Sequence, residues 1–143
     1  MYNKQVIENG NKWYNQWMTV DHAREPVFLD VLNTFNDQPV DILEIGTTYD
    51  KDDPQAIKGA GFSTFYWADY IKQFGGSLTI VDINPIAIEN CILMIGDFIK
   101  AGVDVRFVCG DGLDWLKKNN DYQLVYLDGS DKEYETFEMF RLI

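Results

Sequence analysis

Residues 75–85 read GGSLTIVDINP, and this stretch decides the fold. Its apolar run, Ser77–Asn84, is short and ends at an acid and an amide, which is typical of a buried strand. Asn84-Pro85 then predicts a helix start, because asparagine is a good N-cap and proline suits the first helical position. The two glycines before the run predict the end of a preceding helix. The stretch is therefore a strand between two helices.

Apolar runs of the same kind recur along the chain and alternate with helical patterns. They predict further strands at Val40–Gly46, Val103–Asp111 and Tyr122–Gly129. A wide apolar stripe with helical spacing separates the second and third strands, and its members are Ile88, Cys91, Ile92, Ile95, Phe98 and Ile99. Strands that alternate with helices imply parallel pairing through right-handed crossovers. We therefore expect an α/β protein whose doubly wound parallel sheet has helices on both faces.

The first 38 residues have a helical pattern instead. Pro26 suits the first position of a helix, and Trp13 and Trp17 are four residues apart, so that they could share a helix face. The pattern changes after Pro39, where the first predicted strand begins. We expect residues 1–38 to form an N-terminal helical segment that packs on a core domain spanning residues 39–143.

Composition and charge exclude several classes of protein. The chain has 143 residues, 46% of them hydrophobic, so a single domain is expected. It carries 12 Lys+Arg against 23 Asp+Glu, a net charge of −11, without a basic stripe, which disfavours nucleic-acid and anionic-membrane partners. No apolar run reaches the ~18 residues that span a membrane, and no secretory-signal pattern is present. The two cysteines lie in apolar segments and predict buried thiols in a cytoplasmic protein.

Sheets of this architecture bind ligands beyond the carboxyl ends of their strands, and here each of those ends carries an acid. Asp82 lies at the end of the second strand, where a carboxylate can accept from both hydroxyls of an adenosine ribose. Asp82 could instead cap the helix near Pro85, but Asn84 is the better-placed cap, and we favour the ribose. Gly46 ends the first strand, where the absence of a Cβ lets a nucleotide approach.

The turn after Gly46 does not suit a dinucleotide. A pyrophosphate would require G-x-G-x-x-G there, whereas residues 46–51 read GTTYDK and two more acids, Asp52 and Asp53, follow. Acids crowding a pyrophosphate are electrostatically unfavourable. The pattern favours an adenosine ligand without phosphates, such as S-adenosylmethionine, whose sulfonium is positive and whose tail is a zwitterion.

Four stretches in order carry a resemblance to a known family. They are ILEIGT, GFSTFYWADYIKQFGGSLTIVDINP, VRFVCGDGLDWL and YQLVYLDGSDKEYE. With these stretches the chain resembles the class I S-adenosylmethionine-dependent methyltransferases, specifically their small-molecule O-methyltransferase-like branch, over Val40–Ile143. The resemblance implies a Rossmann-like fold and transfer of a methyl group to a small-molecule acceptor, at oxygen. The family's sheet has seven strands and four are recognisable here, so we expect a C-terminally incomplete version.

The resemblance also implies which residues surround the methionine half of the cofactor. The methionine half would be bordered by residues at the end of the first strand, namely Glu44, Gly46 and Thr47. Ser63 would hold the serine position of the family's G-x-S-T pattern, at a helix N-terminus that favours a carboxylate.

For the adenosine half, the resemblance implies Asp82 on the ribose with Ile83 beside the adenine. Asp111 would accept a hydrogen bond from the adenine amino group, and Gly112 or Leu113 would line its pocket.

Asp128 is the candidate catalytic residue and a further cofactor contact, since the resemblance places it near the sulfonium or the acceptor. In metal-dependent relatives an acid at this strand end helps to hold Mg²⁺. Asp131, which stands where many relatives have histidine, could share a divalent cation with Asp128, although stabilisation of a helix N-terminus is the favoured reading. His22 is the single histidine, and a surface or capping role is favoured for it.

Three features depart from the family pattern or leave alternatives open. The segment 47–61 is longer than the family's glycine turn, and its role is open. The fourth strand would lie at an exposed sheet edge, which predicts that the chain self-associates or is unstable. An NAD-dependent oxidoreductase and a non-catalytic Rossmann-like domain remain as alternative functions; NAD binding would favour the first, and failure to bind any adenosine ligand the second.

Overall fold

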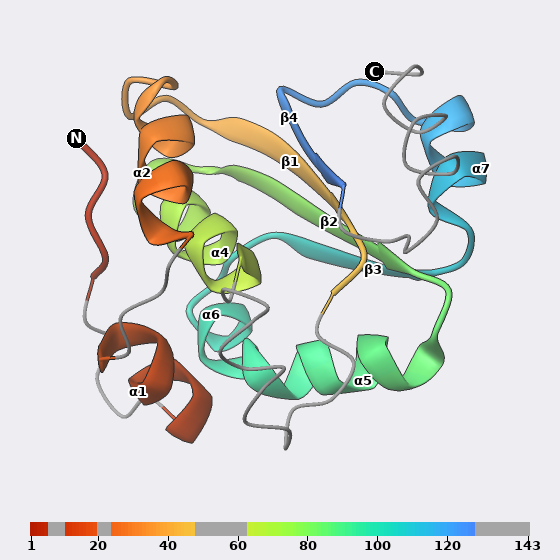
Figure 1. Cartoon of the computed structure of the whole chain (residues 1–143), viewed down its shortest axis with the longest axis horizontal. Helices are drawn as coiled ribbons and strands as arrows, with labels where there is room; N and C mark the ends of the chain where they lie inside the picture. Colours follow the sequence, from red (N-terminus) through yellow and green to blue (C-terminus); the bar gives the residue numbers. More distant parts are fainter. Residues whose placement is uncertain (6–10, 20–23, 48–62, 128–143) are drawn as a thin grey trace.

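Four parallel strands form one sheet in the computed structural model, which describes residues 1–5, 11–19, 24–47 and 63–127 (Figure 1). The strands are β1 (Val40–Ile45), β2 (Gly76–Asp82), β3 (Val105–Cys109) and β4 (Leu124–Leu127), in the spatial order β3-β2-β1-β4. Each lies within the run that predicted it or differs from it by a residue or two. The expected α/β fold with a parallel sheet is confirmed.

The helices cover both faces of this sheet. They are α1 (Lys12–Thr19), α2 (Glu25–Asn33), α4 (Ser63–Phe74), α5 (Pro85–Met94), α6 (Gly96–Lys100) and α7 (Gly112–Lys118). From β1 through β2 to β3 the chain steps in one direction, and it then returns to place β4 on the other side of β1. Right-handed crossovers therefore put α7 on the face opposite α4, α5 and α6, as Figure 1 shows. The change of direction makes the β1–β4 boundary a topological switch point.

Alternate residues of the central strands fill two separate apolar cores. Ile42 and Ile80 point to the face that carries α1, α2, α4, α5 and α6, whereas Leu43 and Val81 point to the α7 face. The first core is rich in aromatic rings, and Trp17 of α1 stacks on Phe65 of α4 at a centroid distance of 5.6 Å. Burial on both faces explains why the strands are continuously apolar in sequence.

The N-terminal residues pack on this first core. The side chains of Tyr2 and Trp17 are buried there, whereas Trp13 is only partly buried at its margin. Tyr2 Oη donates to Asp69 Oδ2 of α4 over 2.7 Å, and burial raises the pKa of Asp69 to about 6. The N-terminal segment is thus fixed against the helix that follows β1, while the domain boundary after residue 38 stays a prediction.

Two details of the predicted pattern are wrong. The stripe from Ile88 to Ile99 forms two helices, because the backbone leaves the helical region at Ile95 (φ −100°, ψ 18°). Two members of the stripe, Ile92 of α5 and Ile99 of α6, are 40% and 37% exposed instead of buried. Cys109 is also exposed, since it ends the edge strand β3, whereas Cys91 is buried as expected.

Other expectations concern the sheet edge and the membrane. β4 does lie at an edge of the sheet within the described part of the chain, and self-association through it stays a prediction. Across the described ranges, no helix is both long enough and apolar enough to cross a membrane.

Replacement of Gly76 by alanine tests the close approach of β2 to β1. Gly76 has φ +110°, and a Cβ there would lie 1.9 Å from the backbone oxygen of Val40. We expect Gly76→Ala to lower the free energy of unfolding by about 3 kcal/mol or more, measured by urea denaturation. Gly102→Ala is the matched control, because Gly102 has φ +93° with nothing near its Cβ position, and should cost only about 1 kcal/mol. Equal losses in the two variants would contradict the steric explanation.

Candidate functional site

The carboxyl ends of β1, β2 and β3 bring the predicted residues to one edge of the sheet. Ile45 pairs with Val81 and Asp82 pairs with Cys109, so the turns after the three strands are neighbours. The Gly46 amide donates to the backbone oxygen of Val81 over 2.8 Å, and the Gly110 amide donates to the backbone oxygen of Asp82 over 3.0 Å. The parallel register extends into the turns and fixes their spacing.

Glu44 is a buried carboxylate that joins β1 to the start of α4. Its side chain is 1% exposed, and it accepts from Ser63 Oγ and Thr64 Oγ1, each over 2.6 Å. A carboxylate only accepts, so both hydroxyls must donate to it and can offer any further group their lone pairs alone. Ser63 is the first residue of α4, and its hydroxyl donates to Glu44 of β1.

Asp82 is held in one orientation by two backbone amides. Its Oδ2 accepts from the Thr47 amide over 3.0 Å and its Oδ1 accepts from the Asn84 amide over 2.8 Å. The helix α5 is capped by Asn84, whose side chain accepts from the Ile86 amide over 2.9 Å, as the sequence predicted. Asp82 is half-buried and is not the helix cap, and each carboxylate oxygen keeps a lone pair for a further donor.

Apolar surface lies next to this carboxylate. Ile83 is 72% exposed and Ile86 is 60% exposed, although both are large aliphatic side chains. Beside a fixed acid, such surface suits the flat face of an aromatic base.

The third strand end has a structural task that the sequence did not reveal. Asp111 caps α7, because its Oδ1 accepts from the amides of Leu113 and Asp114 over 2.8 and 3.1 Å. A Cβ on Gly112 would lie 2.3 Å from Ile45 Cγ2, so glycine lets α7 pack closely on β1. These contacts account for both residues without a ligand, and their predicted adenine contacts stay predictions.

Two residues near the site were missed by sequence reasoning. Thr64 Oγ1 lies 3.4 Å from Thr47 Oγ1, and the thiol of Cys91 lies against both threonine hydroxyls. Burial raises the pKa of the Cys91 thiol to about 12, with the charge of Glu44 adding to the effect, so the thiol is neutral at physiological pH. Thr64 adjoins a predicted residue in sequence, but nothing in the sequence pairs Cys91 with Thr47.

Several predicted residues lie outside the described residues. Asp128, Asp131 and His22 are among them, as is the segment 48–62. Within the ranges that the structure describes, no three histidine, cysteine or carboxylate side chains gather as metal ligands. A divalent cation at Asp128 therefore stays a prediction.

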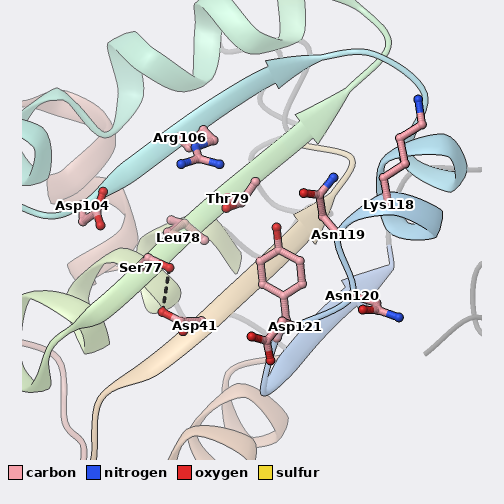
Figure 2. Close-up of a pocket in the computed structure, with 11 residues that line it drawn as sticks. Asp41, Ser77, Leu78, Thr79, Asp104, Arg106, Lys118, Asn119, Asn120 and Asp121 are labelled. Atoms are coloured by element: carbon pink, nitrogen blue, oxygen red, sulfur yellow. Dashed lines mark hydrogen bonds between the residues drawn. The ribbon is translucent and has the colours of Figure 1, made fainter.

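A separate polar cavity of about 370 Å³ lies at the opposite, amino ends of the strands (Figure 2). Asp41, Thr79, Arg106 and Tyr122 are among its lining residues, and Asp41 accepts from Ser77 Oγ over 2.7 Å. The cavity carries charges of both signs and shares no residue with the strand-end site.

Comparison with known proteins relates the chain to solved structures. No family model matches it, and no curated protein matches it significantly. The cofactor-bound Rv0187 from MTB matches with a TM-score of 0.61 and 19% identity over 96% of this chain and 63% of that chain. A methyltransferase from Geobacter sulfurreducens matches with a TM-score of 0.56 and 11% identity over 95% of this chain and 66% of that chain.

A protein-L-isoaspartate O-methyltransferase matches with a TM-score of 0.50 and 20% identity over 78% of this chain and 30% of that chain. The chain thus spans about a third to two thirds of the three solved chains. It has the Rossmann-like α/β fold that these structures share, as the sequence resemblance implied.

Asp111→Ala tests the capping assignment. We expect the substitution to lower the free energy of unfolding by about 1 kcal/mol in urea denaturation, because two amides of α7 lose their acceptor. Asp111→Asn keeps an acceptor oxygen and should lie within a few tenths of a kcal/mol of wild type. If the alanine variant is as stable as the wild type, the cap is not what holds Asp111 in place.

Proposed function

We propose that the chain binds S-adenosylmethionine at the carboxyl ends of β1 and β2 and transfers its methyl group to a small-molecule acceptor, at oxygen. The observation that carries the proposal is the Asp82 carboxylate, which two backbone amides fix beside the exposed side chain of Ile83. The likeness to solved methyltransferases supports it at the level of fold.

Asp82 is the proposed ribose ligand. Its two oxygens lie in a fixed plane and keep lone pairs for the two neighbouring ribose hydroxyls. Hydrogen bonds to a charged acceptor contribute roughly 1.5–3 kcal/mol each. Because the carboxylate is already oriented, little side-chain entropy is lost when the ribose binds.

The rest of the cofactor would extend to either side of Asp82. The adenine would lie on Ile83, and the methionine half would lie over Gly46, whose φ of +89° and missing Cβ leave room for it. Ser63 and Thr64 donate their protons to Glu44, so their oxygens can take part in any further hydrogen bond only as acceptors, which suits the methionine ammonium. This assignment differs from the carboxylate contact that the resemblance implied for Ser63.

A dinucleotide fits the same turn less well. Its pyrophosphate would need free amides after the first strand, but the Thr47 amide is committed to Asp82. The net charge of −11 adds repulsion toward any phosphate. We therefore propose the phosphate-free cofactor over NAD.

Methyl transfer requires the acceptor to be aligned with the methyl group and water to be excluded from the site, and it requires little covalent catalysis. The cofactor supplies a methyl group activated by the sulfonium, and the chain has to orient the acceptor and take up its proton. Asp128 is the proposed base, on the resemblance alone.

A cytoplasmic location also stays a proposal, supported by the two free cysteines.

Calorimetric titration with S-adenosylhomocysteine tests the cofactor proposal. We expect the wild-type chain to bind it and Asp82→Ala to bind at least tenfold more weakly, since tenfold corresponds to about 1.4 kcal/mol and the loss of one charged hydrogen bond costs at least that much. Asp41→Ala is the matched control. Like Asp82, Asp41 is a half-buried acid of a central strand, but it lies in β1 at the opposite, amino ends of the strands.

NAD serves as the second ligand in the same titration. A folded wild-type chain that binds NAD and not S-adenosylhomocysteine would favour the oxidoreductase alternative. A folded chain that binds neither would contradict the cofactor proposal and favour a non-catalytic domain.

A further inference from the structure

A line of hydrogen bonds connects the two halves of the proposed cofactor site. It begins at Glu44, which accepts from Thr64 Oγ1 over 2.6 Å, and continues from Thr64 to Thr47 Oγ1 over 3.4 Å. The Thr47 amide then donates to Asp82 Oδ2 over 3.0 Å. The line therefore runs from the start of α4, beside the proposed methionine position, to the proposed ribose ligand.

The direction of each bond follows from chemistry. A carboxylate has no proton to give, so the single hydroxyl proton of Thr64 goes to Glu44. The hydroxyl of Thr47 must then be the donor to Thr64, and its amide is the donor to Asp82. With these protons assigned, the contact with the Thr64 oxygen constrains the hydroxyl of Thr47.

One end of the line is buried and the other is partly exposed to solvent. Glu44 and Thr64 are 1% and 6% exposed, while Thr47 and Asp82 are only half-buried. The buried thiol of Cys91 lies against both threonine hydroxyls. The 3.4 Å contact is longer than a typical hydroxyl pair of about 2.8 Å, so it is the weakest link and the one that a ligand can tighten.

The sheet itself does not depend on this link. β1 and β2 are joined by their own parallel ladder from Val40 to Ile45, and the Gly46 amide extends that ladder to Val81. Loss of one threonine hydroxyl leaves these backbone bonds in place. The Thr64–Thr47 contact is therefore available for a task other than fold stability.

We propose that Thr64 is a positioning residue that couples the two halves of the site: by holding Thr47, it orients Asp82 for the ribose although it lies at the methionine side. The inference rests on the proposed function and adds a specific coupling to it. It makes binding of an adenosine group depend on a side chain that the adenosine does not reach.

Adenosine is the decisive ligand, because it has the ribose and the adenine but no methionine. We expect Thr64→Val, which keeps the shape and removes the hydroxyl, to weaken adenosine binding by about threefold to tenfold in calorimetry. Thr64→Ser should restore the wild-type affinity. Thr79→Val is the matched control, since Thr79 is a threonine of similar burial, 5% exposed, on the other face of the sheet.

A double-variant cycle provides a second test if Thr64→Val folds poorly. Thr47→Val removes the same link from its exposed side and leaves the Thr47 amide on Asp82. The double variant should bind adenosine no more weakly than the weaker single variant, because both changes remove the same Thr64–Thr47 contact.

Two results would overturn the inference alone: wild-type affinity for adenosine in Thr64→Val, or additive losses in the double variant. A folded wild-type chain that binds neither adenosine nor S-adenosylhomocysteine would overturn the proposed function and this inference with it.

Discussion

The buried carboxylate of Glu44 is the constraint on which the site depends. A carboxylate at 1% exposure is costly unless hydrogen bonds compensate its lost hydration, and two hydroxyls of α4 supply them. Because Ser63 and Thr64 must reach β1 to do so, the N-terminus of α4 is fixed at the carboxyl end of the sheet. The aromatic core packs on the same helix and stabilises that position.

The sheet order explains why the two ends of the strands differ. The return of the chain from β3 to β4 leaves a switch point between β1 and β4. The turns after β1 and β2 meet on the other side of β1, next to that switch point. One fixed acid and exposed isoleucines lie at this end. The amino ends instead hold an open cavity whose charges have both signs, among them Asp41 and Arg106.

Much of the fold could be predicted because its signals are local. The apolar runs, the paired glycines before β2 and the Asn84-Pro85 start each depend on a few neighbouring residues, and all have counterparts in the structure. The break at Ile95 and the exposure of Cys109 depend on where helices and edge strands pack, which no local pattern gives. In the site, the acid of β2 was identifiable by position. The Glu44–Thr64 pairing joins residues 20 apart and follows only from the crossover geometry.

The location of the ligand is what most needs measurement. Amide chemical-shift changes in the ¹⁵N-labelled chain during titration with S-adenosylhomocysteine would report it residue by residue. We expect the largest changes at Gly46, Thr47 and Ile83, where the Asp82 carboxylate is fixed. Changes confined to residues around the opposite cavity, such as Ser77 and Arg106, or no changes at all, would contradict a cofactor site at the carboxyl ends of β1 and β2.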